Sequence, residues 1–193
     1  MGPTAADSSF DVAVWFMDRA VADGEYLQPQ KLHRLLYLAQ AYYGVARNGE
    51  KLMPATFVAD VDGPLEPTLY RAFERGRPNV DVRPLDEPAV HVLDSIWRQF
   101  GPHSTEHLNK LIQRHPPYLD ALAIAQNCEI TFESMVAFYG AQGLKGRQIQ
   151  GGSDAVRAPA PAINQVLRPR TLRNHDGKPV SVTGWMPRKA ESP

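Results

Sequence analysis

Apolar residues recur at intervals of three and four positions through most of the first 150 residues, the spacing of one face of an α-helix. Ser8 or Ser9, Ser104 and Thr131 stand where N-caps are expected, and glycines follow several of the periodic stretches. The pattern predicts a mainly α, compact domain of six to seven helices, at about residues 9–22, 29–46, 69–76, 89–101, 104–115, 116–126 and 131–143.

The pattern changes between the second and third predicted helices. Asn48-Gly49 is a strong turn signal, and the TFVADV run at 56–61 favours a β-hairpin or an extended strap. The stretch VDGPLEPTLY, residues 61–70, follows directly. Gly63 accepts a positive φ, and the two prolines of the stretch fix their own φ and bias the preceding residues away from helix. We therefore expect a sharp turn that enters the next helix in a set direction and brings Tyr70 toward Tyr37.

Charge divides the 193-residue chain into two parts. Residues 1–150 hold 14 Lys and Arg against 18 Asp and Glu, whereas residues 151–193 hold 7 against 3. The second part is rich in Pro and Gly but keeps several apolar residues, which favours an irregular basic tail that docks on the body or on a partner. The net charge of zero argues against a chain that wraps nucleic acid. A single cysteine, no secretory pattern and no long apolar run predict a cytoplasmic location without membrane insertion.

Candidate chemistry is sparse along the whole chain. His103 and His107 have the spacing of metal ligands, but the acid that a zinc protease helix needs directly after the first histidine is replaced by serine. Cys128 follows an apolar helix and is read as a packed residue. Neither a GxSxG elbow nor a phosphate-binding glycine motif occurs. The sequence therefore predicts a binding protein that is not an enzyme and that needs no cofactor or metal.

Two stretches in order, KLHRLLYLAQAYY at 31–43 and DGPLEPTLYRAF at 62–73, resemble the Panacea domain, a family associated with antitoxins that includes the SocA proteolytic adaptor. The matching positions are Lys31, Leu32, Leu35, Leu36, Tyr37, Gly63, Pro64, Pro67 and Tyr70. A third family motif is matched at Leu111, Pro117 and Ala121, with Tyr118 in place of tryptophan and Ile112-Gln113 in place of Thr-His. The resemblance covers about residues 10–140, within the helical domain that we assign to residues 1–150, and the basic tail at 151–193 lies outside it.

Two readings of the turn and the second helix remain open. Tyr37 and Tyr70 both fill the core, or the seam between them forms a rigid and partly exposed face for a partner. His33, Tyr37 and Gln40 share a side of the helix distinct from its leucine stripe, as a polar and aromatic contact surface would. The predicted partner-binding residues are Lys31, His33, Tyr37, Gln40, Gly63, Pro64, Glu66, Tyr70, Trp185, Met186 and Arg188.

The resemblance implies an antitoxin that binds a cognate toxin protein directly. Family members suggest two routes, masking of the toxin or delivery of it to the ClpXP protease through the ClpX unfoldase, and the tail with its Trp185 and Met186 favours delivery. A nucleic-acid-associated regulator that uses the tail arginines is an alternative, although no nucleic-acid partner is expected. A metal-dependent enzyme centred on His103 and His107 is a third.

Overall fold

The computed structural model describes residues 4–74, 76–145, 160–167, 171–173 and 179–181. Seven helices make the body: α1 (Ser9–Ala22), α2 (Pro29–Ala46), α3 (Pro67–Phe73), α4 (Glu87–Phe100), α5 (Thr105–Ile112), α6 (Pro116–Ile124) and α7 (Phe132–Lys145). The predicted mainly helical fold is therefore confirmed. No helix in the described ranges is long and apolar enough to cross a membrane.

Side-chain caps fix where the helices begin. Ser8 accepts a hydrogen bond from the N–H of Phe10 at 3.1 Å, and Asp11 accepts one from the N–H of Ser8 at 2.9 Å, which completes a capping box at α1. Ser104 caps α5 through the N–H of His107, and Thr131 accepts from the N–H of Ser134 in the first turn of α7. These caps satisfy N–H groups that would otherwise lack partners, so the predicted helix starts are confirmed at these three places.

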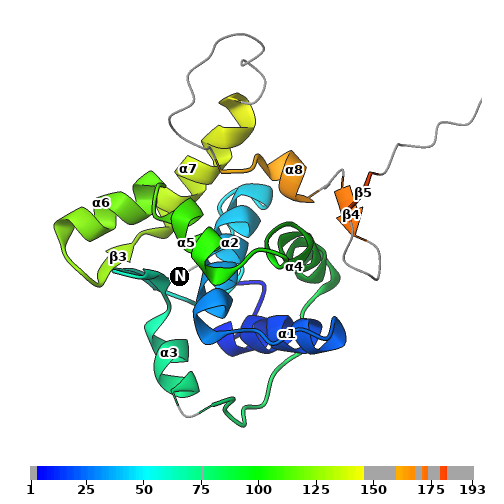
Figure 1. The fold of residues 1–193 in the computed structure, drawn as a ribbon. Helices are drawn as coiled ribbons and strands as arrows, with labels where there is room; N and C mark the ends of the chain where they lie inside the picture. Colours follow the sequence, from blue (N-terminus) through cyan, green and yellow to red (C-terminus); the bar gives the residue numbers. More distant parts are fainter. Residues whose placement is uncertain (1–3, 75, 146–159, 168–170, 174–178, 182–193) are drawn as a thin grey trace, which may run out of the picture.

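Helix α2 runs through the middle of the body, with α1, α4, α5 and α7 packed around it (Figure 1). Its residues are buried on every side from Leu32 to Gly44. Its aromatic side chains form the centre of the core, where the ring of Tyr42 lies 5.1 Å from that of Tyr139 and 5.9 Å from that of Phe100. A helix enclosed in this way has no solvent face, although its sequence carries histidine, arginine and glutamine.

A small antiparallel sheet lies beside α6. Strands β1 (Phe57–Asp60) and β2 (Gly63–Leu65) form a hairpin, with Asp60 opposite Gly63, and β3 (Cys128–Ile130) pairs with the other edge of β1. The predicted minor β element is confirmed, but its turn lies at residues 61–62 and not at Asn48-Gly49. The strand order is β2-β1-β3. The sequence did not predict β3, because three residues between two helices carry too short a pattern to be read.

Part of the C-terminal segment returns to the body. Helix α8 (Ile163–Leu167) packs against α4, α7 and α2, and strands β4 (Thr171–Arg173) and β5 (Pro179–Ser181) pair antiparallel. Trp185, Met186 and Arg188 lie outside the described residues.

Candidate partner-binding site

The turn between β1 and β2 is held from beneath by Arg34 of α2. This side chain is 2% exposed, and its guanidinium donates to the backbone oxygens of Asp62 and Pro64, the latter at 2.9 Å. A third hydrogen bond, from Nε, reaches Oδ1 of Asn109 in α5 at 2.6 Å. Burial lowers the pKa of Arg34 to about 10, so the group stays charged at neutral pH. The turn is therefore fixed by a buried cation whose acceptors are two carbonyls and an amide.

Gly63 is required at this turn for two reasons. Its φ of +128° lies in the region that residues with a Cβ rarely adopt. A Cβ built on it would also lie 2.7 Å from Nε of Arg34 and 2.9 Å from its Nη2. The glycine therefore lets the guanidinium lie directly against the backbone. The restricted backbone of residues 61–67 keeps the turn in the conformation that this contact needs.

Glu66 connects the turn to α3 and to α2. Its carboxylate caps α3, accepting from the N–H of Leu69 at 2.6 Å and of Thr68 at 3.3 Å. Its own N–H donates to Nδ1 of His33 at 3.3 Å. The pKa of His33 is lowered to about 4, mainly by burial and to a smaller extent by the positive charge of Arg34. His33 is therefore neutral at physiological pH, with Nδ1 free of a proton and acting as an acceptor.

The outer side of the turn is attached to α6 and to the end of α5. The hydroxyl of Tyr118 donates to the backbone oxygen of Asp60, and Nε2 of Gln113 donates to that of Val61 at 3.2 Å. Gln113, which ends α5, serves as a structural hydrogen-bond donor to the turn. Contacts from α2, α5 and α6 thus converge on five residues of backbone.

The prediction that His33, Tyr37 and Gln40 form a contact surface is wrong, because all three side chains are buried. Gln40 exchanges two hydrogen bonds with the backbone of Met53, at 3.0 and 3.1 Å. The ring of Tyr37 packs edge-on against that of Phe57 at 5.6 Å. Periodicity within α2 could not show this, because the elements that cover its polar side come from later in the chain.

Tyr70 does not lie against Tyr37 as expected. Its ring stands 6.3 Å from that of His33, and the residue is 52% exposed. The core reading therefore holds for Tyr37 but not for Tyr70. Lys31 is largely covered, with Nζ 3.8 Å from a carboxylate oxygen of Glu25 and 5.9 Å from the centre of the Trp97 ring.

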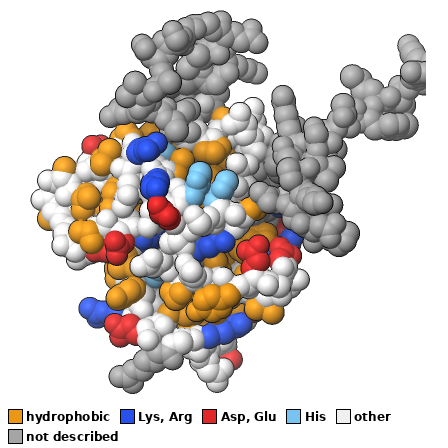
Figure 2. Space-filling model, in the orientation of Figure 1, with side chains coloured by type: hydrophobic (Ala, Val, Ile, Leu, Met, Phe, Trp, Pro, Cys, Tyr) orange, Lys and Arg blue, Asp and Glu red, His pale blue; other side chains and the backbone are white. Residues whose placement is uncertain are grey.

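Apolar side chains nevertheless reach solvent on the elements beside the turn. Val61 is 57% exposed in the turn itself, and Leu119 and Ile124 are 39% and 77% exposed on α6. We call these three residues and Tyr70 the turn–α6 surface. Figure 2 shows apolar side chains gathered over the α6 side of the molecule. Neither residues 52–70 nor residues 116–144 contain a lysine or an arginine.

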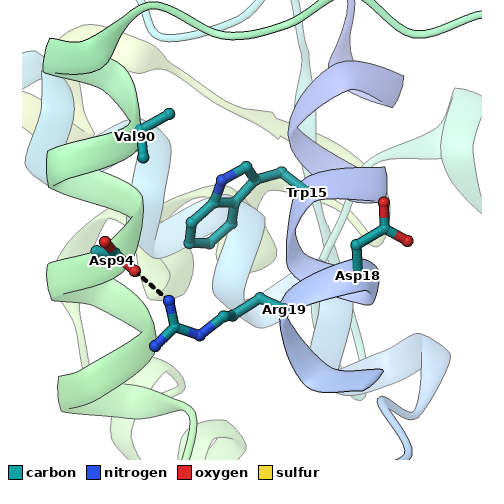
Figure 3. Close-up of a pocket in the computed structure, with 5 residues that line it drawn as sticks. All are labelled: Trp15, Asp18, Arg19, Val90 and Asp94. Carbon is teal, nitrogen blue, oxygen red and sulfur yellow. Dashed lines mark hydrogen bonds and ion pairs between the residues drawn. The ribbon is translucent and has the colours of Figure 1, made fainter. Parts of the chain in front are cut away.

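A groove between α1 and α4 has a volume of about 300 Å³ (Figure 3). The indole of Trp15 lies between the two helices, and Arg19 reaches across to Asp94, with Nη1 2.6 Å from Oδ1. The other acid that lines the groove, Asp18, pairs with Arg77 at 2.9 Å. Because both carboxylates already have arginine partners, the groove carries no charge left over for a ligand.

The residues considered as metal ligands or as a nucleophile, His103, His107 and Cys128, do not form a metal site among the described residues. The rings of His103 and His107 stack face to face at 4.3 Å. Within the described ranges no three His, Cys, Asp or Glu side chains group as metal ligands would. Cys128 is a free, half-buried thiol in β3.

Comparison of the chain with family models, with curated proteins and with solved structures gives no match. The resemblance to the Panacea domain therefore rests on the sequence motifs themselves.

Proposed function

We propose that this chain is an antitoxin that binds a toxin protein directly, through the turn–α6 surface, and delivers it to the ClpXP protease. The observation that carries the proposal is the turn itself. Arg34 and Tyr118 fix its backbone from two sides, while Val61 and Tyr70 stay exposed around it. A surface that is ordered before binding loses little conformational entropy when a partner docks, which favours affinity.

The chemistry of the surface defines the partner. Aromatic and aliphatic anchors at the centre of an interface usually carry most of the binding energy. Three acidic residues, Asp62, Asp120 and Glu129, are exposed on or next to the elements that carry these anchors, against one exposed base in the described part of these elements, Arg71, which follows Tyr70 in α3. The toxin would therefore present an apolar contact bordered by lysine or arginine, and long-range attraction would speed its association at low salt.

Delivery to a protease works through effective concentration. A tethered substrate meets the protease in an intramolecular step, which raises capture by orders of magnitude without new chemistry. In this proposal the residues that contact ClpX are those after β5, where Trp185 and Met186 offer apolar anchors and Arg188 offers charge. Masking of the toxin without proteolysis is the competing route.

A growth assay tests whether the turn–α6 surface binds the toxin. The gene next to the one for this chain is expressed alone and together with the chain, and rescue of growth identifies the pair. Tyr70→Ala and Val61→Asp should abolish rescue while the melting temperature changes little, because both side chains are largely exposed. Tyr26→Ala is the matched control, since Tyr26 is 83% exposed but is not part of this surface. Rescue by all three variants alike would contradict the assignment of the surface.

A second experiment separates delivery from masking. The rescued toxin is incubated with purified ClpXP and ATP, with the full chain or with a chain that ends at Ser181. This end point keeps α8, which packs on the body. Delivery predicts rapid toxin loss with the full chain only, whereas equal toxin lifetimes with both chains would exclude the tethering role of residues 182–193.

A further inference from the structure

Residues 160–167 are seated on the body in the manner of a bound peptide. Val166 is fully buried and Ala160 is 3% exposed, whereas Asn164 and Gln165 face solvent. The hydroxyl of Tyr42 donates to the backbone oxygen of Pro161 at 2.6 Å. The segment therefore has an apolar inner side, a polar outer side and one directed hydrogen bond.

The attachment is almost wholly apolar: Ala160 and Val166 belong to the buried core, and Ile163 and Leu167 pack against it. Among the described residues, the Tyr42 bond is the one hydrogen bond that joins this segment to the body, and no ion pair joins them. Helix α8 has five residues, a length that does not form a helix without a surface to pack on. Docking therefore orders the segment, as it does for peptides that fold on binding.

The helices beneath residues 160–167 also contact one another. Helix α2 packs directly against α4 and α7, and Tyr42 contacts the rings of Phe100 and Tyr139 below the segment. These contacts do not pass through residues 160–167. Helices α2, α4 and α7 are thus held together by contacts of their own. Residues 146–159 link the segment to the end of α7 in the sequence.

We propose that the groove between α4 and α7, over Tyr42, is a peptide-binding site that the chain's own residues 160–167 close as a displaceable occupant. Its ligands are uncharged segments of the form Ala-Pro-Ala, followed by one helical turn that places a β-branched residue six positions after the first alanine. A partner segment of this chemistry enters only by displacing the occupant. The site is separate from the turn–α6 surface and does not depend on the proposed function.

The test opens the groove in the full-length protein and supplies the segment as a separate molecule. Val166→Asp places a charge at a fully buried position, which disfavours docking of the segment. Asn164→Asp is the matched control, because it adds the same charge to the exposed side of the same helix. The probe is a fluorescent peptide of residues 158–167, APAPAINQVL, which contains no charged side chain, and binding is followed by anisotropy.

The peptide should bind the Val166→Asp chain at least about tenfold more tightly than the wild type or the Asn164→Asp chain, whose tethered segment competes at a high effective concentration. A peptide that itself carries Asp at position 166 should bind none of them. Adding Tyr42→Phe to the open chain should weaken binding by about fivefold, through loss of the hydrogen bond to Pro161.

Three results would overturn the proposal. Loss of cooperative unfolding in the Val166→Asp chain would show that the segment is integral to the core. Absence of peptide binding to a folded Val166→Asp chain would show that the groove does not recognise the segment. Equal binding to the open chain and the wild type would place the peptide elsewhere on the surface.

Discussion

Replacing Gly63 by alanine tests the central feature of the turn, the passage of a buried guanidinium against its backbone. The substitution adds one methyl group and changes no charge. That methyl would lie 2.7 Å from Nε and 2.8 Å from Cζ of Arg34. Arg34 has no free direction of retreat, because it donates to two backbone oxygens of the turn and to Asn109.

The loss of stability has two parts. A positive φ at alanine costs about 1–2 kcal/mol. Moving the guanidinium far enough to admit the methyl breaks at least one of its hydrogen bonds, and a hydrogen bond to a charged group contributes about 1.5–3 kcal/mol. Gly63→Ala should therefore lower the free energy of unfolding by about 3–5 kcal/mol, a large share of the stability of a typical domain.

Urea unfolding followed by circular dichroism measures this loss, and Gly24→Ala provides the matched control. Gly24 follows α1 with a φ of +72°, and no atom lies within 4 Å of a Cβ built there. The control therefore carries backbone strain without the clash. The smaller entropy of the unfolded alanine chain is common to both variants and cancels in the comparison.

A double-mutant cycle with Arg34→Met then isolates the contact. In the Arg34→Met background, Gly63→Ala should cost about 1.5–3 kcal/mol less than in the wild type, because the guanidinium that opposes the methyl is gone and only the backbone strain remains. Equal losses for Gly63→Ala and Gly24→Ala in the wild-type background would refute the argument that close approach to Arg34 selects glycine at this turn.

Two further predictions concern stability. His33 and His115 have pKa values lowered to about 4 by burial, against about 6.5 when unfolded, so the unfolded state binds more protons. The free energy of unfolding should fall as the pH drops below 6.5 and level off below 4, with a loss of about 2 kcal/mol per histidine by pH 5. Urea titrations at pH 7, 6 and 5 measure this loss, and His115→Phe should show about half of it. A free energy of unfolding that falls equally with pH in His115→Phe and in the wild type would contradict the prediction. Glu66→Ala should lower the free energy of unfolding by about 1–2 kcal/mol at pH 7, because the cap of α3 is lost, and Glu66→Asp should recover part of it in the same assay.

The helices could be predicted because their signals are local. Most carry their apolar spacing and a start signal within about fifteen residues: Ser8 and Asp11 cap α1, whereas α2 and α6 begin with proline. Strand β3 lacks such a signal, and it forms because β1 offers a free edge beside it. A hairpin or strap was predicted from the β-branched and aromatic run at 56–61, and this run forms β1, but the chain reverses after it, at residues 61–62, and not at Asn48-Gly49.

The candidate site was predicted in part. Gly63 and Pro64 were expected to make a constrained turn, and both do. Arg34 was missed, although it donates two hydrogen bonds to the backbone of this turn. Thirty positions separate it from Pro64, and an arginine within a leucine-rich helix reads as a solvated charge when a single sequence is all that is known.

The amino-acid sequence determined where helices start, where the backbone must turn, and that the body is acidic and the C-terminal segment basic, since each of these follows from neighbouring residues or from composition. The tertiary structure decided which polar side chains of α2 are buried, that Tyr70 reaches solvent, and that residues 160–167 close a groove over Tyr42. These outcomes depend on which distant elements cover a given surface. Burial is a property of the packed molecule, and the spacing of residues within one helix does not contain it.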